Sequence, residues 1–194
     1  MDTIRRGPTA QREDSPSPDE ALALRCRAGD LAAFDLLAHR YQPRLYGYAL
    51  RMVGHSQEAE DLTQETLLRA FASLGRFDAN QPFGRWLFGI AAHVCRDWLR
   101  WRFRRREQAS AASGQAYVTA TPRDEAIAAE EQARVAQAVR RLPLKYREVV
   151  VLHYMEDMGY EEVAATLGIR PDAARRRALR AREMLQRYLG GQRP

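Results

Sequence analysis

The apolar residues of this 194-residue chain recur at intervals of three and four, the period of an α-helix, and this pattern constrains the fold more than any other feature. It is longest over residues 82–106, where the apolar stripe comprises Phe83, Leu87, Ile90, Val94, Trp98 and Trp101. Residues 149–152 are apolar and mostly β-branched, but helical patterns flank them on both sides. The sequence therefore predicts an all-α fold.

Interruptions of the helical pattern predict two small helical domains joined by a flexible linker. Residues 1–18 are polar, contain three prolines and predict a disordered tail. The two predicted domains span 19–106 and 122–190. Between them, residues 108–120 lack charge and periodicity, so we expect 107–121 to be a flexible linker.

Local signals predict where several helices begin or end. Asp30 is expected to cap one helix, and Pro43 to break or kink it. Ser56 is the predicted cap of a helix that ends near residue 75, and Pro82 suits the first turn of the next. Asp124, three residues after a Thr-Pro pair begins, resembles part of a capping box that starts the second domain.

The charge is concentrated in two separate segments. The chain has a formal net charge of +6, and its basic residues are 30 arginines and one lysine. Residues 79–106 contain seven arginines and one acidic residue, residues 170–194 contain eight and two, and the stretch between them is acidic. Two basic segments at a distance fit an extended polyanion, above all nucleic acid, although two solvated helix faces remain an alternative.

Several classes of protein are disfavoured. No apolar run approaches the length of a membrane-spanning helix, and the N-terminus has no secretory signal. Cys26 and Cys95 are too few for a disulfide scaffold or a cysteine-rich zinc site, and they favour a reducing cytoplasm. The four histidines are widely separated and no phosphate-binding glycine loop occurs. We therefore expect no catalytic residues, metal, cofactor or small-molecule substrate.

The segment from Tyr160 to Asp172 predicts a helix, a tight turn and a second helix. Ala164 provides the small residue needed where two helices cross, and Gly168 suits the turn. The second helix has a small apolar stripe of Ala174, Ala178, Ala181 and Leu185. Arg175, Arg176 and Arg180 lie off that stripe, which is typical of a helix that enters a DNA groove. An ordinary amphipathic helix hairpin is the alternative.

The predicted helix 56–74 has two contrasting faces. One face carries Asp61, Gln64, Glu65 and Leu68, and the other carries Ala59, Thr63, Leu67, Ala70, Phe71 and Leu74. The second set predicts a buried side. The first is either a solvated surface or an acidic surface that binds a protein, because an acidic surface would repel phosphates.

The basic helix 82–106 has the opposite character. Trp86, His93, Arg96 and Arg100 lie partly off its apolar stripe. Aromatic and arginine side chains on one surface suit unstacked bases and their phosphates. Burial in the core is the more ordinary role of the tryptophans.

Together these motifs resemble a known family. The segment Ala59-Glu-Asp-Leu-Thr-Gln-Glu65, followed by Phe83-x-x-Trp86-Leu87, resembles the second conserved region of bacterial sigma factors. The segment from Leu142 to Val150, with the helix-turn-helix pattern after it, resembles their fourth region. No third region lies between them. This is the pattern of the extracytoplasmic-function (ECF) group, and the resemblance covers roughly residues 21–189.

The resemblance implies a subunit without enzymatic activity that binds core RNA polymerase, recognises the −35 and −10 promoter elements and promotes DNA melting. Its partners would be the β′ clamp helices of polymerase, promoter DNA and an anti-sigma factor able to hold it at the membrane. The implied polymerase-binding residues are Asp61, Gln64, Glu65 and Leu68. The implied −10 residues are Phe77, Asn80, Trp86, His93, Arg96 and Arg100. The implied −35 residues are Arg170, Asp172, Ala173, Arg175, Arg176 and Arg180.

The sequence departs from the family pattern at several positions. His93 stands where the family usually has Asn, and Gly159 where a capping Ser is common. Residues 172–179 differ at most positions from the usual Gly-Thr-Val-Lys-Ser-Arg-Leu-His. We therefore expect a −35 sequence unlike that of commoner relatives.

Three other functions compete with this interpretation. A helix-turn-helix activator would bind duplex DNA unaided and would lack the Asp61 face. An enzyme would need a nucleophile–base pair or a phosphate loop at a recognisable spacing. A redox sensor would use Cys26 and Cys95, but free cysteine is more often a small buried apolar residue.

Overall fold

The computed structural model describes residues 18–110 and 128–190, and within these ranges every regular element is a helix, which confirms the all-α fold. The elements are α1 (Pro18–Arg27), α2 (Leu31–Val53), α3 (Ser56–Ser73), the short 3₁₀ helix η1 (Leu74–Arg76), α4 (Phe83–Ser110), α5 (Ala128–Arg141), α6 (Leu144–Tyr154), α7 (Tyr160–Leu167) and α8 (Pro171–Gly190).

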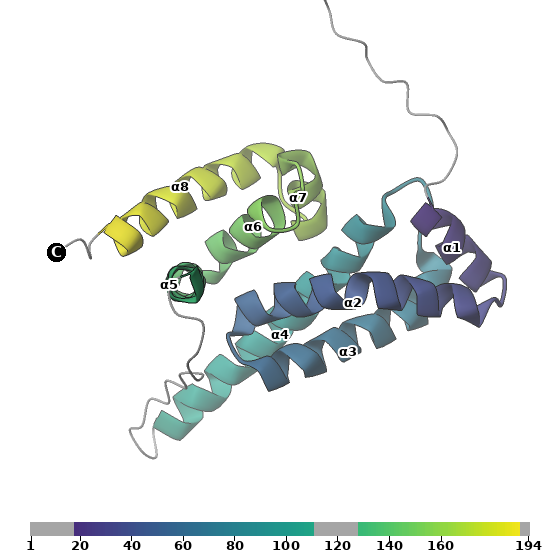
Figure 1. Ribbon diagram of the computed structural model, residues 1–194, viewed down its shortest axis with the longest axis horizontal. Helices are drawn as coiled ribbons and strands as arrows, with labels where there is room; N and C mark the ends of the chain where they lie inside the picture. The colour runs from purple at the N-terminus through teal and green to yellow at the C-terminus, as the bar shows by residue number, and fades with distance from the viewer. Residues whose placement is uncertain (1–17, 111–127, 191–194) are drawn as a thin grey trace, which may run out of the picture.

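Helices α1–α4 form the first domain, in which α2 and α3 run antiparallel and α4 crosses behind them (Figure 1). The fully buried rings of Tyr48 and Phe88 meet edge to face at 5.6 Å between centroids and join α2 to α4. At the start of α4, the backbone N–H of Phe83 donates a 2.5 Å hydrogen bond to Oε1 of Glu20 in α1. The first N–H groups of a helix lack intrahelical partners and carry partial positive charge, so this carboxylate stabilises the N-terminus of α4.

The ends of α2 and α3 follow the sequence signals only in part. Asp30 caps α2 as predicted, with its Oδ1 accepting from the backbone N–H of Ala33 at 3.3 Å. Gly54 ends α2 with a φ of 80°, a conformation that glycine adopts without strain. The predicted break at Pro43 does not occur, because α2 continues through it with Tyr41 and Leu45 buried two positions to either side. Ser56 is not the cap of α3, since His55 holds that position without a side-chain hydrogen bond.

Helices α5–α8 form the second domain, and α6 and α7 both lie against α8 (Figure 1). The turn between α7 and α8 is closed by Ile169, whose backbone N–H donates to the Ala164 carbonyl at 2.9 Å. Gly168 has a φ of 65°, which favours glycine at this turn. Ala174, Ala178 and Ala181 are buried on one face of α8, as the apolar stripe predicted.

The two domains pack directly against each other, which the sequence analysis did not anticipate. Helix α7 lies against α4, and α5 and α6 lie against α2. A Cβ atom added to Gly89 would lie 3.8 Å from the Thr166 carbonyl oxygen, so α4 and α7 are in close contact. The buried residues of both domains form one continuous cluster.

Two predicted boundaries change. Pro18, placed at the end of the tail, is the first residue of α1, and the rest of the tail lies outside the described residues. Helix α4 extends to Ser110, so the first four residues of the predicted linker 107–121 are helical. The remainder of the linker and the predicted capping box near Asp124 lie outside the described residues.

Phe71 is the one member of the predicted buried side of α3 that is open to solvent. Its side chain is 45% exposed, although its ring meets that of Phe34 edge to face at 5.0 Å. Ala59, Thr63, Ala70 and Leu74 are buried as expected.

The crossing of α7 and α8 predicts a strong size limit at Ala164, which is 2% exposed. We expect Ala164→Leu to lower the free energy of unfolding by about 1–3 kcal/mol, because added methyl groups overpack a filled core. Urea denaturation followed by circular dichroism measures the change. The neighbouring Ala165 is exposed, so Ala165→Leu is the matched control and should stay within about 0.5 kcal/mol. Equal losses in both variants would contradict close packing at the crossing.

Candidate nucleic-acid interface

The outward face of α3 presents the four residues predicted to bind a protein. Asp61 and Gln64 are exposed, and Leu68 is 65% exposed. Glu65 is half-buried and accepts a 2.6 Å hydrogen bond from Nε of Arg69. Among the described residues, Asp61 and Gln64 have no hydrogen bond or ion pair, so their polar groups are available to a partner. The structure therefore brings this predicted set together as one acidic surface with an apolar residue at its C-terminal end.

Phe77, predicted to contact a base, lies in the core instead. It is only 2% exposed, and its ring centroid lies 5.5 Å from that of Phe83 and 5.1 Å from that of Trp86. Its carbonyl oxygen accepts from Nη1 of Arg27 at 3.2 Å. Direct contact of this ring with a base does not fit the structure. The enclosed ring instead anchors the loop between η1 and α4.

Asn80 is the exposed polar residue of that loop. Oδ1 of Asp78 accepts from both the backbone N–H and the side-chain Nδ2 of Asn80, at 3.0 and 2.8 Å. This local turn holds the exposed Asn80 side chain in the loop, and the half-buried Trp86 follows in the first turn of α4. Of the predicted −10 residues that reach the surface, Asn80 lies in this loop and Trp86 lies just after it.

The remaining predicted −10 residues of α4 divide into two groups. His93 and Arg100 are exposed. Arg96 has only 18% of its side chain exposed, and its Nε donates a 2.7 Å hydrogen bond to Oε1 of Glu148 in α6. Arg96 is therefore occupied by the second domain and is not open to DNA in this arrangement, because the packing of α6 and α7 against α2 and α4 covers this part of α4.

A second ion pair crosses between the domains. Nε of Arg44 in α2 donates to Oε2 of Glu156, which follows α6, at 3.1 Å. Burial raises the pKa of the Glu156 carboxyl, and the charge of Arg44 opposes that shift. Arg147 of α6 also donates to the backbone carbonyl of Met52 at the end of α2. Three arginines thus take part in polar contacts at this interface.

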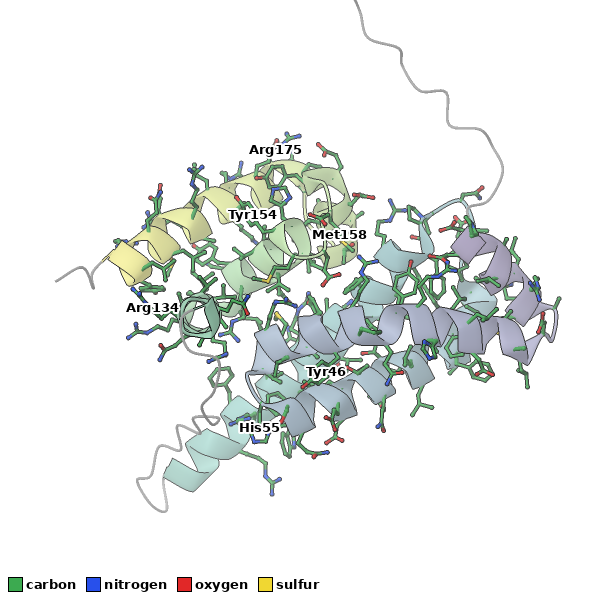
Figure 2. All side chains as sticks on the ribbon, in the orientation of Figure 1. Tyr46, His55, Arg134, Tyr154, Met158 and Arg175 are labelled. Carbon is green, nitrogen blue, oxygen red and sulfur yellow. The ribbon has the colours of Figure 1, made fainter. Side chains whose placement is uncertain are left out.

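The predicted −35 residues cluster at the start of α8. Arg170, Asp172, Arg175, Arg176 and Arg180 are exposed, whereas Ala173 is half-buried. Arg175 projects on the side of α8 away from the first domain and pairs with Glu161 of α7 and, at 3.5 Å, with Asp172 (Figure 2).

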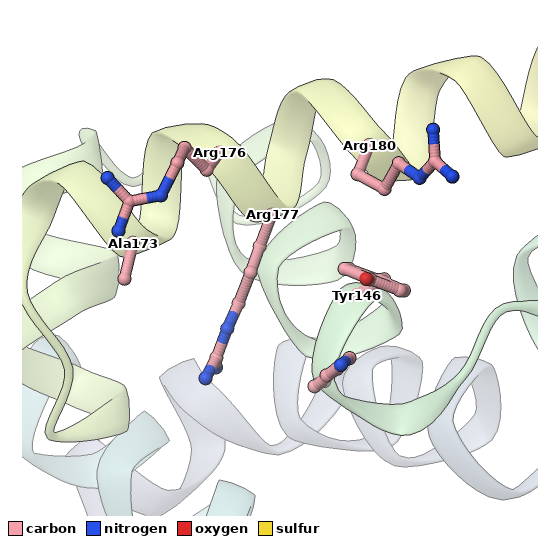
Figure 3. A pocket seen from close by; sticks show the side chains of 6 residues that line it. Tyr146, Ala173, Arg176, Arg177 and Arg180 are labelled. Atoms are coloured by element: carbon pink, nitrogen blue, oxygen red, sulfur yellow. The ribbon is translucent and has the colours of Figure 1, made fainter.

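A basic hollow of about 370 Å³ lies between α6 and α8 (Figure 3). It is lined by Lys145, Tyr146, Ala173, Arg176, Arg177 and Arg180. The sequence patterns did not predict Lys145 and Arg177 as members of this surface. The spacing of Arg177 from Ala173 and Arg180, four and three residues, is a signal that places it on their side of the helix. Lys145 had no comparable signal, because it comes from another helix.

The two cysteines are buried and unsuited to redox sensing. Cys26 is 7% and Cys95 1% exposed, and burial raises the pKa of the Cys95 thiol to about 12. At neutral pH the thiol of Cys95 therefore stays protonated and unreactive. Within residues 18–110 and 128–190, no group of three or more His, Cys, Asp or Glu side chains is placed to hold a metal ion. No helix in those same ranges has the length and apolar character to cross a membrane.

Comparison with known proteins matches both helical domains of this chain to one protein family. The family model Sigma-70 region 2 matches residues 37–106, and the model Sigma-70, region 4 matches residues 132–185. The chain is 37% identical over 166 residues to RNA polymerase sigma factor CarQ of Myxococcus xanthus, covering 86% of this chain and 94% of the relative. It is 30% identical over 172 residues to ECF RNA polymerase sigma factor SigW of Bacillus subtilis, covering 84% and 92%. The solved structure of CnrH in complex with the cytosolic domain of CnrY matches with a TM-score of 0.71 and 30% identity, covering 90% of this chain and 99% of that chain.

The helical domains, with a helix-turn-helix at α7 and α8, define a DNA-binding transcription factor. The chain belongs to the sigma-70 family of RNA polymerase sigma factors, in its ECF group, which confirms the resemblance found in the motifs.

The Arg44–Glu156 pair yields a titration prediction. Because burial raises the pKa of Glu156 and Arg44 lowers it, Arg44→Ala should raise this pKa further. A carboxyl with a raised pKa binds its proton more tightly when folded. The stabilising contribution of Glu156 is therefore full below its ordinary pKa and is lost as the pH rises to the raised pKa of the folded chain. Because Arg44→Ala raises the folded pKa further, this loss should extend to a higher pH. Carboxyl-carbon NMR titration measures the pKa.

The matched control is Arg40→Ala, one turn earlier on α2, where the arginine pairs with Asp19 instead. We expect this variant to leave the Glu156 titration unchanged. An identical titration in the wild-type and Arg44→Ala chains would show that Arg44 does not act on Glu156.

Proposed function

We propose that this sigma factor uses three surfaces: the acidic face of α3 for core polymerase, the loop after η1 with α4 for the −10 element, and α8 for the −35 element. The observation that carries the proposal is the separation of charge. The chain is basic overall, yet α3 turns Asp61, Gln64 and Leu68 to solvent while the outer surface of α8 is rich in arginine.

The α3 face suits a protein partner of the clamp-helix kind. Negative charge there disfavours the DNA backbone, whereas Leu68 offers apolar area that association would bury. The matched residues of region 2 include this whole helix. Asp61 and Gln64 supply polar groups without internal partners, and Glu65, held by Arg69, completes the surface.

For the −10 element, the surface residues are Asn80, Trp86, His93 and Arg100. An exposed amide, a half-buried indole and two basic or aromatic side chains suit an unstacked strand, where stacking and charge offset the cost of opening the duplex. Phe77 supports this surface from below by packing against Trp86. Arg96 joins the surface once Glu148 releases it.

For the −35 element, α8 is the second helix of the helix-turn-helix and the helix expected to enter the major groove. Arg176 is exposed and, among the described residues, has no ion pair, so it is the arginine of α8 best placed for a base edge. Lys145 and Arg177, in the hollow beside it, suit the flanking phosphates.

This division of labour requires the two domains to separate. The −10 and −35 elements lie about 25 base pairs apart, or roughly 85 Å at about 3.4 Å per pair. In the structure α7 rests on α4 and α6 on α2, so α4 and α8 are too close to reach both elements together. The packed arrangement is thus a closed form, in which Arg96 is ion-paired with Glu148. Promoter binding needs an open form.

The proposed setting is a cytoplasm, where a second protein restrains the sigma factor. The similar protein CnrH was solved with the cytosolic domain of CnrY, which supports a partner of the anti-sigma kind for this chain. The protein acts by binding polymerase and promoter DNA, as sigma factors do, and carries no catalytic step of its own.

The docking surface is tested with Asp61→Ala combined with Gln64→Ala. We expect affinity for bacterial core polymerase to fall at least tenfold, about 1.4 kcal/mol, with circular dichroism unchanged. Labelled full-length protein is titrated with core polymerase, and in parallel with free duplex DNA at the same salt. Wild-type protein should bind polymerase tightly and duplex weakly.

Asp35→Ala is the control, since Asp35 is an exposed acid of the first domain that belongs to α2 and not to the α3 face. It should keep most of the affinity. Tight duplex binding without polymerase binding would instead indicate a stand-alone DNA-binding regulator.

The closed form is tested with Glu148→Gln. This change preserves size but removes the charge that holds Arg96, which we expect to favour opening by about 1–2 kcal/mol, roughly tenfold. Small-angle X-ray scattering should report a larger radius of gyration, and a single-stranded −10 oligonucleotide should bind more tightly. Glu161→Gln, at an exposed acid that pairs within the second domain, should change neither quantity. A Glu148→Gln chain that stays as compact as the wild type would show that this pair does not hold the domains together.

A further inference from the structure

The side of α8 opposite its buried alanines is a row of four exposed residues. They follow one another at i, i+4, i+7 and i+11, and they are Asp172, Arg176, Leu179 and Glu183. Each of the four lies two residues before a member of the apolar stripe of α8. Two residues correspond to a rotation of about 200°, so the row lies on the opposite side of the helix from the stripe. The row therefore lies on the exposed side of α8, which is the side that would face a groove, and its Arg176 side chain also borders the hollow between α6 and α8.

The two ends of this row are already occupied. Oδ1 of Asp172 lies 3.5 Å from Nη1 of Arg175, and Oε2 of Glu183 accepts from Nη1 of Arg180 at 2.7 Å. These pairs neutralise carboxylates that would otherwise repel phosphates. They also leave the two central members, Arg176 and Leu179, as the ones free to meet base edges.

Leu179 is the unusual member of the row. It is 60% exposed, and it stands in the most basic segment of the second domain, next to Arg180 and three residues after Arg176. Within the major groove, the base edges present polar donors and acceptors except for the C5-methyl group of thymine. A leucine opposite any other base edge would remove water from polar atoms without replacing their hydrogen bonds, whereas opposite thymine it buries a methyl group.

We propose that Leu179 is a specificity-determining residue that contacts the C5-methyl group of one thymine in the −35 duplex. The inference rests on the proposed function of α8. Three residues of helix rise about 4.5 Å, and base pairs are spaced by about 3.4 Å, so this thymine lies within one or two base pairs of the base that Arg176 contacts.

The test uses the holoenzyme formed from the full chain and bacterial core polymerase. Promoter fragments randomised over both elements are enriched for binding, and each thymine of the enriched −35 segment is then replaced singly by deoxyuridine, which removes only the methyl group. At one position we expect the wild-type affinity to fall about three- to fivefold, as loss of one buried methyl implies. Leu179→Ala should bind the thymine duplex more weakly by a similar or larger factor and be insensitive to deoxyuridine at that position.

Two controls separate this contact from a general effect. Arg176→Ala should alter the dependence on the neighbouring base pair while keeping the deoxyuridine effect. Val135→Ala shortens another exposed apolar side chain of the second domain, on α5, and should leave every effect unchanged. Leu179→Ala is expected to fold, because alanine is the most favourable residue for a helix.

The proposal is overturned if no thymine of the enriched −35 segment is sensitive to deoxyuridine, or if Leu179→Ala retains the sensitivity. Failure of the proposed function would differ from this, because the wild-type holoenzyme would then enrich no −35 sequence at all.

Discussion

The ion pair between Arg96 and Glu148 constrains how the two domains pack, because it buries a carboxylate whose charge partner lies in the other domain. Glu148 is 4% exposed, and a buried carboxylate is tolerated only with a charge partner and hydrogen bonds. Because Arg96 belongs to α4, Glu148 keeps this charge partner only while the two domains stay packed together. The same contact covers Arg96, an arginine of the proposed −10 surface. In the proposed function, packing of the two domains and access of this surface to promoter DNA are therefore opposed.

The two proposed binding surfaces differ in charge. The α3 face carries Asp61 and Glu65 with Leu68 at its C-terminal end, and α8 carries arginines on both sides of Leu179. In both places an exposed leucine lies within a charged surface, where the charge selects the class of partner and the apolar side chain adds area to bury. Internal ion pairs refine this division, because Glu183 and Asp172 on α8 are neutralised by arginines of the same helix.

Sequence periodicity was sufficient for features that depend on a single helix. The alanine stripe of α8, the acidic face of α3 and the turn at Gly168 follow from spacing and from the conformational preference of glycine, and all three are present in the structure. Pro43 was misjudged because its local preference is overridden by packing on both sides of it. Phe77 was misjudged because a loop residue gives no periodic signal of burial, and only the neighbouring Phe83 and Trp86 rings enclose it.

The sequence by itself determined the helical class, the division into two domains, the family and the faces of α3 and α8, since each depends on residue types at fixed spacing along the chain. Only the tertiary structure decided that Glu20 caps α4, that Arg96 is held by Glu148 and that Lys145 joins the arginines of α8. These contacts join residues from different helices, 63 positions apart for Glu20 and Phe83 and 52 for Arg96 and Glu148. Helical periodicity extends only a few turns along one element, whereas such pairs arise from how whole helices pack, and that packing is set by the summed burial of many side chains.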